Sequence, residues 1–118
     1  MKLNKIHSDK RGDIYTLTEL LVFPEITLFK TNKGMARGGC IHNINREFVC
    51  VLEGNIRYTT PRQSVELEAG DTYRINSNTP HYFESLTDSL VVEWGATPEE
   101  KAVKHPEFRK IVEEINKR

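Results

Sequence analysis

Four side chains that can bind metal ions or move protons stand out in this 118-residue chain: Cys40, His42, Glu47 and His81. Cys40 and His42 are two positions apart in a segment that we expect to be a strand, so their side chains are expected on the same face. Thiolate, imidazole and carboxylate groups are good ligands for zinc and other first-row divalent metals. Imidazole and carboxylate groups also act as acids and bases near neutral pH. The pattern therefore predicts one polar cluster for metal binding or proton transfer.

Each of these residues also has a purely structural interpretation. Free cysteine is among the most buried residue types, so Cys40 can equally be a small hydrophobic core residue. His42 and His81 can be core histidines that neighbouring groups satisfy by hydrogen bonds. Glu47 opens the apolar run Phe48–Leu52, where a charge lies either in solvent at a strand end or with a partner inside the fold. The residue types alone leave both interpretations open.

The elements that would position this cluster are short strands. Turn-forming triplets recur along the chain, such as Arg11-Gly12-Asp13, Glu53-Gly54-Asn55 and Ala69-Gly70-Asp71. Between the turns lie segments rich in Ile, Val, Thr, Tyr and Phe, namely Ile14–Leu20, Glu25–Thr31, Phe48–Leu52, Ile56–Thr60, Ser64–Glu68, Thr72–Asn76 and Leu90–Trp94. Many short strands with closely spaced turns are typical of an antiparallel sandwich or barrel.

The pattern changes after residue 94. The segment Thr97–Glu100 combines a helix N-cap, a proline at the first helical position and a capping-box glutamate. A second helix is predicted from Pro106, with apolar residues at helical spacing: Phe108, Ile111, Val112 and Ile115. We therefore expect one domain, a β-barrel over residues 1–96 and a helical tail over 97–118 that packs across the barrel or against a second subunit.

Composition restricts the partners and the cellular setting. Lysine plus arginine equals aspartate plus glutamate at 17 each, which provides no electrostatic basis for binding nucleic acid or a membrane surface. The first twenty residues are charged throughout and hold no apolar stretch suited to a signal peptide or a membrane span. Cys40 and Cys50 form neither a CxxC pair nor a disulfide framework, and Cys50 is expected in the core. We expect a cytoplasmic protein with free thiols.

The segment from Cys40 to Gly54 resembles the first sequence motif of the cupin superfamily. That motif is a pair of histidines followed by a glutamate and then by a glycine. His42, Glu47 and Gly54 match its second histidine, its glutamate and its glycine, whereas Cys40 stands in place of its first histidine.

The segment from Gly70 to His81 is similar to the second cupin motif, which runs from Gly-Asp through a Pro-x-Gly turn to a histidine. Gly70, Asp71 and His81 match, and Asn76 and Asn78 replace the proline and the glycine. Asparagine tolerates the same tight-turn dihedral angles. The two motifs together imply an all-β cupin fold, a double-stranded β-helix or jelly-roll barrel, with the polar cluster at its mouth.

Further motifs are similar to the sugar-nucleotide branch of the cupins, which includes the dTDP-4-dehydrorhamnose 3,5-epimerases and the dTDP-4-keto-6-deoxyglucose 3,4-ketoisomerases. These motifs are Asp9-x-Arg11-Gly12, Arg37-Gly38 and His81-Tyr82-Phe83 followed by Asp88. The resemblance implies an isomerase or epimerase of a nucleotide-linked keto sugar that requires no cofactor. His42 would transfer protons, with Cys40 as a second candidate.

The same resemblance implies that Arg37, His81 and Trp94 bind the substrate. The planar donor fork of Arg37 suits a sugar phosphate, although an arginine beside a Gly-Gly turn can equally lie on the surface. Two features depart from the branch. Cys40 replaces the histidine that serves there as the base, and residues 94–98 lack the tyrosine that serves the epimerases as an acid.

Two alternative functions follow from these departures. One is a metal-dependent cupin in which Cys40, His42, Glu47 and His81 hold zinc, iron, manganese or nickel and act on a small molecule. The other is a non-catalytic, sugar-binding cupin. The sequence favours an enzyme without deciding the reaction, because a fold alone assigns no chemistry. We also expect a homodimer that pairs through barrel edges.

Overall fold

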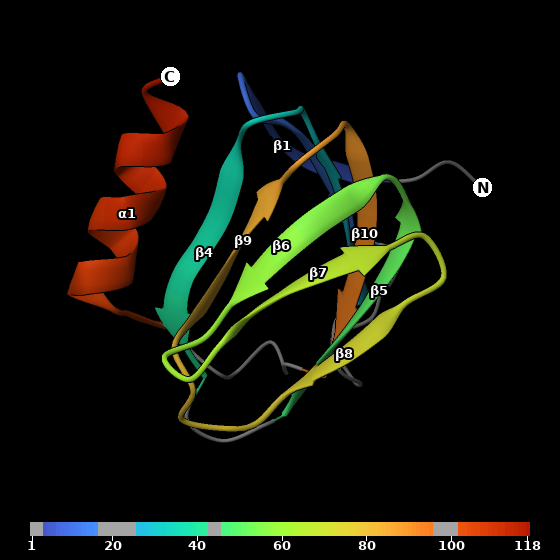
Figure 1. Ribbon diagram of the computed structural model, residues 1–118. Helices are drawn as coiled ribbons and strands as arrows, with labels where there is room; N and C mark the ends of the chain where they lie inside the picture. Colours follow the sequence, from blue (N-terminus) through green and yellow to red (C-terminus); the bar gives the residue numbers. More distant parts are fainter. Residues whose placement is uncertain (1–3, 17–25, 43–45, 96–101) are drawn as a thin grey trace.

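The computed structural model of the protein describes residues 4–16, 26–42, 46–95 and 102–118. These residues form two antiparallel sheets with one helix packed outside them (Figure 1). The strand order in the first sheet is β1 (Asn4–Asp9), β2 (Gly12–Thr16), β3 (Ile26–Thr31), β10 (Ser89–Trp94), β5 (Glu47–Glu53) and β8 (Thr72–Ile75). The order in the second is β11 (Val103–Lys104), β4 (Ala36–Ile41), β9 (His81–Ser85), β6 (Asn55–Thr59) and β7 (Ser64–Glu68). The predicted all-β fold is confirmed.

Each predicted strand has a counterpart, and Ser64–Glu68 coincides with β7. Residues 17–20 of the first predicted strand lie outside the described residues. The predicted strand Thr72–Asn76 corresponds to β8, which ends at Ile75, and His81 begins β9 after a turn. The chain turns at Asn78, whose φ of 61° is left-handed. The Asn78 N–H donates to the carbonyl of His42 at 2.8 Å, which ties this turn to the end of β4.

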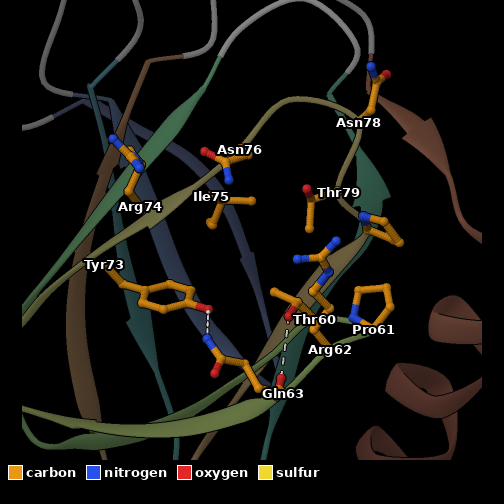
Figure 2. Close-up of a pocket in the computed structure, with 11 residues that line it drawn as sticks. Thr60, Pro61, Arg62, Gln63, Tyr73, Arg74, Ile75, Asn76, Asn78 and Thr79 are labelled. Carbon is orange, nitrogen blue, oxygen red and sulfur yellow. Dashed lines mark hydrogen bonds between the residues drawn. The ribbon is translucent and has the colours of Figure 1, made fainter.

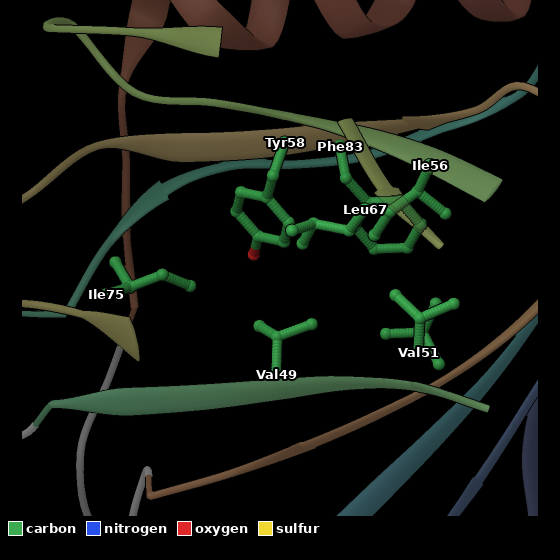
Figure 3. Close-up of a cluster of buried hydrophobic side chains, with 8 residues drawn as sticks. Val49, Val51, Ile56, Tyr58, Leu67, Ile75 and Phe83 are labelled. Atoms are coloured by element: carbon green, nitrogen blue, oxygen red, sulfur yellow. The ribbon is translucent and has the colours of Figure 1, made fainter. Parts of the chain in front are cut away.

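A hydrophobic core fills the space between the two sheets. Figure 3 shows these side chains converging from both sheets; the cluster comprises Val49, Val51, Ile56, Tyr58, Leu67, Ile75, Phe83 and Val91. Strand alternation places Val49 and Val51 on the inner face of β5 and the residue between them on the outer face. The prediction that Cys50 is a core residue was therefore wrong, since its half-buried side chain lies on that outer face.

The C-terminal helix α1 (Pro106–Asn116) begins where proline predicted it. The side chain of His105 caps it and accepts a hydrogen bond from the N–H of Phe108 at 3.3 Å. The helix lies beside β4 (Figure 1), and its buried face contacts β4 and β9. Val112 of the helix packs against Ala36. No helix among the described residues is long and apolar enough to cross a membrane.

The first predicted helical segment, Thr97–Glu100, lies outside the described residues. Beyond it, Val103 and Lys104 form β11 instead of a helix, and they pair with Ile41 and Cys40 of β4. β4 is thus held by β11 at its end and by α1 along its outer side. The side chain of Asn116 donates to the Ala36 carbonyl at 3.0 Å and accepts from the Ala36 N–H at 2.7 Å.

Candidate functional site

The polar cluster of Cys40, His42, Glu47 and His81 lies at one end of the barrel, where β4 and β10 end and β5 and β9 begin. A register shift between Gly38 and Cys40 places Cys40 directly opposite His81 in the β4–β9 pair. The shift includes Gly39, whose φ is 86° and where a Cβ atom would lie 2.8 Å from the Arg109 side chain of α1. The helix and the glycine therefore set the position of the Cys40 thiol.

The four side chains converge as the sequence predicted. One ligand atom each from Cys40, His42 and His81 lies within 4.8 Å of the other two. Glu47 Oε1 is 3.2 Å from His42 Nε2 and 3.1 Å from His81 Nε2. His81 Nδ1 donates a hydrogen bond to the Thr79 carbonyl at 2.8 Å, which orients the ring so that Nε2 faces Glu47 and the cluster.

Burial changes the acid–base properties of the cluster. Burial, together with the negative charges of Glu47 and Glu93, raises the pKa of the Cys40 thiol from 9.0 to about 12. Burial opposes protonation of His81, but the hydrogen bond and the charge of Glu47 outweigh it and raise the pKa of His81. Cys40 therefore remains a neutral thiol at physiological pH unless a metal ion displaces its proton. This weakens the expectation that Cys40 acts as a base on its own.

The cluster borders a cavity of about 230 Å³ inside the barrel, which we call the inner cavity. Its lining comprises Phe29, Arg37, Gly38, Cys40, His42, Glu47, Tyr58, His81, Phe83 and Glu93. The sequence analysis did not identify Tyr58 and Glu93 as residues of this site. The Tyr58 hydroxyl donates a hydrogen bond to Glu93 Oε1 at 3.0 Å. Burial, together with the negative charge of Glu47, raises the pKa of Glu93 from 4.5 to about 7. The signal that could have revealed Glu93 is a lone charge in an otherwise apolar strand.

Arg37 forms part of the wall of the inner cavity and is only 4% exposed. Its Nε donates to Thr31 Oγ1 at 2.8 Å, and its Nη2 donates to the Lys30 carbonyl at 3.3 Å. The guanidinium carbon lies 5.6 Å from the centre of the Phe29 ring. Burial lowers the pKa of Arg37 to about 10, so the group still carries its charge at neutral pH. The structure thus excludes the alternative of a surface arginine.

The cupin domain family model matches residues 32–96 of this chain, more than half of its length. The chain belongs to the cupin family. This confirms the predicted jelly-roll fold, and the cupin motifs correspond to the residues that converge at the barrel end.

Three solved structures with a similar fold are distant in sequence from this cupin. The capsular polysaccharide assembling protein CapF from Staphylococcus aureus is 17% identical with a TM-score of 0.70, over 88% of this chain and 32% of CapF. KdgF from Halomonas sp. is 16% identical with a TM-score of 0.70, over 81% of this chain and 89% of KdgF. A variant of oxalate decarboxylase from B. subtilis is 15% identical with a TM-score of 0.74, over 87% of this chain and 30% of that protein.

These likenesses show the fold alone. The chain spans about a third of the length of CapF and of the oxalate decarboxylase. No curated protein matches it. The sugar-nucleotide branch that the sequence motifs implied is therefore not established by the comparisons, and the chemistry of this cupin must be argued from its own residues.

Trp94, which was expected to bind substrate, and the Asp9–Arg11 motif lie outside the inner cavity. Trp94 follows Glu93 on β10, so strand alternation turns its side chain to the outer face of the sheet, where it stacks on Phe48 at 5.6 Å. It is 37% exposed and does not line the inner cavity. The Asp9–Arg11 motif forms an ion pair of 2.6 Å at the β1–β2 turn. The ion pair stabilises the turn, and neither Asp9 nor Arg11 lines the inner cavity.

A second hollow, of about 670 Å³ and larger than the inner cavity, lies between the β6–β7 turn and the β8–β9 loop (Figure 2). We call it the outer hollow. Figure 2 shows Arg62 and Gln63 on one side of it and Asn76 and Thr79 on another. None of the polar cluster lines this hollow. The inner cavity is therefore the candidate reaction site, because the polar cluster lines it.

Proposed function

We propose that this cupin is a metal-dependent enzyme that isomerises a small carbonyl compound by proton transfer in the inner cavity. The observation that carries the proposal is the convergence of the polar cluster. Ligand atoms of Cys40, His42 and His81 lie within 4.8 Å of one another, and Glu47 Oε1 lies within 3.2 Å of both imidazole Nε2 atoms.

The donor set fits a first-row divalent metal ion. A thiol, two imidazoles and a carboxylate converge, and three of these residues have side chains no more than about a seventh exposed. Thiolate and imidazole together favour zinc, iron or nickel over the harder manganese ion. The two histidines, Cys40 and Glu47 would hold the ion. A bound ion of this kind supplies Lewis-acid polarisation of a substrate carbonyl.

Glu93 and Tyr58 supply the proton chemistry in this proposal. A carboxyl with a pKa of about 7 exchanges protons readily at physiological pH. The Glu93 carboxylate removes the proton from the carbon next to the carbonyl, and the C–H electron pair moves to give an enolate. In a substrate whose deprotonated carbon bears a hydroxyl, this enolate is an enediolate, and the hydroxyl proton passes to the former carbonyl oxygen. Glu93 then returns the first proton to the former carbonyl carbon, so the carbonyl moves by one carbon with no oxidant consumed. The Tyr58 hydroxyl, 3.0 Å from Glu93 Oε1, orients the carboxyl.

A second candidate is the metal-free isomerisation of a nucleotide-linked keto sugar, with His42 as the base. The 3.2 Å contact between His42 Nε2 and Glu47 Oε1 favours it, since an imidazole–carboxylate pair can move a proton. Two observations count against it. The high pKa of Cys40 leaves it without a thiolate partner, and a cavity of about 230 Å³ is below the ~300–1,000 Å³ of sites that enclose drug-sized ligands.

Elemental analysis of protein purified without an affinity tag or chelators tests the proposal. We expect about one transition-metal ion per chain, and its loss in His81→Ala and Cys40→Ala. Cys50→Ala is the matched control, because Cys50 lies on the outer face of β5, and it should retain the metal. Wild-type protein that contains no metal and takes up no zinc, iron or nickel would refute the proposal. Thermal stabilisation of that metal-free protein by nucleotide sugars would favour the second candidate.

A further inference from the structure

We propose that Arg37 binds a carboxylate group of the substrate, so that this cavity takes a small oxo acid. The inference deepens the proposed function, on which it rests for the carbonyl chemistry. It stands on three observations about the guanidinium: an unused donor atom, an uncompensated charge, and a place in the wall of the inner cavity.

The unused donor is Nη1 of Arg37. This nitrogen is buried and has no hydrogen-bond partner among the described residues, whereas Nε and Nη2 donate to Thr31 and to the Lys30 carbonyl. Buried polar groups in folded proteins nearly always have a partner. Because Arg37 lines a cavity beside metal-binding groups, we infer that a ligand atom is the missing partner of its Nη1.

The charge of Arg37 is also uncompensated. No carboxylate among the described residues forms an ion pair with it; Asp9, Asp13 and Glu93 act on it only through longer-range charge. An isolated buried charge is costly unless an opposite charge approaches it. An anionic ligand would therefore gain both a charge-assisted hydrogen bond and the neutralisation of this guanidinium.

The cavity favours a carboxylate over larger anions. A volume of about 230 Å³ corresponds to roughly eight water-sized groups at ~30 Å³ each, which suits a small organic acid. Glu47 and Glu93 line the same cavity. Their negative charge disfavours a dianionic phosphate more than a singly charged carboxylate. With its carboxylate on Arg37, such an acid would direct its carbonyl group toward the polar cluster.

The test compares pyruvate with pyruvamide, which has nearly the same shape but no charge, by calorimetric titration of the wild-type protein. We expect pyruvate to bind about 10- to 100-fold more tightly, as charged hydrogen bonds in buried sites do. The preference should disappear in Arg37→Met. It should persist in the matched control Arg74→Met, because Arg74 is exposed and lies outside the inner cavity. Equal affinities in the wild type, or a preference that survives Arg37→Met, would overturn the inference.

Two further readouts separate the possible failures. Inorganic phosphate that displaces pyruvate at lower concentration than pyruvate itself requires would overturn the assignment to a carboxylate. Metal analysis of the same samples separates this inference from the proposed function. Wild-type protein that holds metal but does not distinguish the two probes overturns only the role of Arg37, whereas metal-free protein that prefers pyruvate supports Arg37 and overturns the metal proposal.

Discussion

Replacing Glu93 by glutamine should stabilise this cupin, and the gain should grow with pH. Burial raises the pKa of Glu93 from 4.5 to about 7 in the folded protein, so the folded state binds this proton more tightly than the unfolded chain does. When folding raises the pKa of a group, the folded protein is most stable at pH values below the pKa of that group in the unfolded chain. The free energy of unfolding then falls as the pH rises through the pKa of the group in the folded protein. Glutamine is uncharged and can still accept the hydrogen bond of Tyr58. The free energy of unfolding of the variant should therefore not fall with pH in this way.

The magnitude follows from the two pKa values. The difference between 4.5 and about 7 corresponds to an upper limit of about 3 kcal/mol, at 1.36 kcal/mol per pH unit. At pH 8 the carboxyl is ionised in both states, and nearly the whole difference should separate the variant from the wild type. At pH 5 the folded carboxyl is still protonated and the unfolded one is mostly ionised, which leaves a gap of about 1 kcal/mol.

Urea unfolding of the two proteins at pH 5 and pH 8, both freed of metal with a chelator, measures the free energies of unfolding. The matched control is Glu66→Gln, because Glu66 is exposed and pairs with Arg57 at the surface. That variant should differ from the wild type equally at both pH values. A gap between Glu93→Gln and the wild type that is the same at both pH values, or that shrinks toward pH 8, would refute the argument that burial holds a proton on Glu93.

Two other predictions concern the cupin glycine and the cysteine of the polar cluster. Gly54 and Gly34 both have φ of 82°, so alanine at either should cost about 1–2 kcal/mol of backbone strain. Gly54→Ala should unfold at clearly lower urea concentration than Gly34→Ala, because only at Gly54 would the added methyl collide with the Asp88 carbonyl; equal midpoints would contradict this. In a Cys50→Ala background, Cys40 should resist iodoacetamide at pH 8, since its pKa is about 12. Mass spectrometry that detects alkylation of Cys40 at the rate of an ordinary exposed thiol would show that the thiol is not held neutral.

The sequence by itself determined the local features of this protein. Closely spaced turns and β-forming segments predicted the strands, and Pro106 predicted the start of α1. The ordered motif residues His42, Glu47 and His81 predicted one polar cluster. These features depend on residues near one another in the chain or on a recognisable motif, which is why they could be inferred without coordinates.

Only the tertiary structure decided which other groups share the cavity. β10 inserts between β3 and β5, so Glu93 meets Tyr58, a residue 35 positions earlier in the chain. The same strand alternation that turns Glu93 inward turns Trp94 outward, so Trp94 does not line the inner cavity. Arg37 lies inside the barrel because β4 presents it to Thr31 of β3. Pairing between strands distant in sequence sets these contacts, and no local pattern of residues encodes which strands will meet.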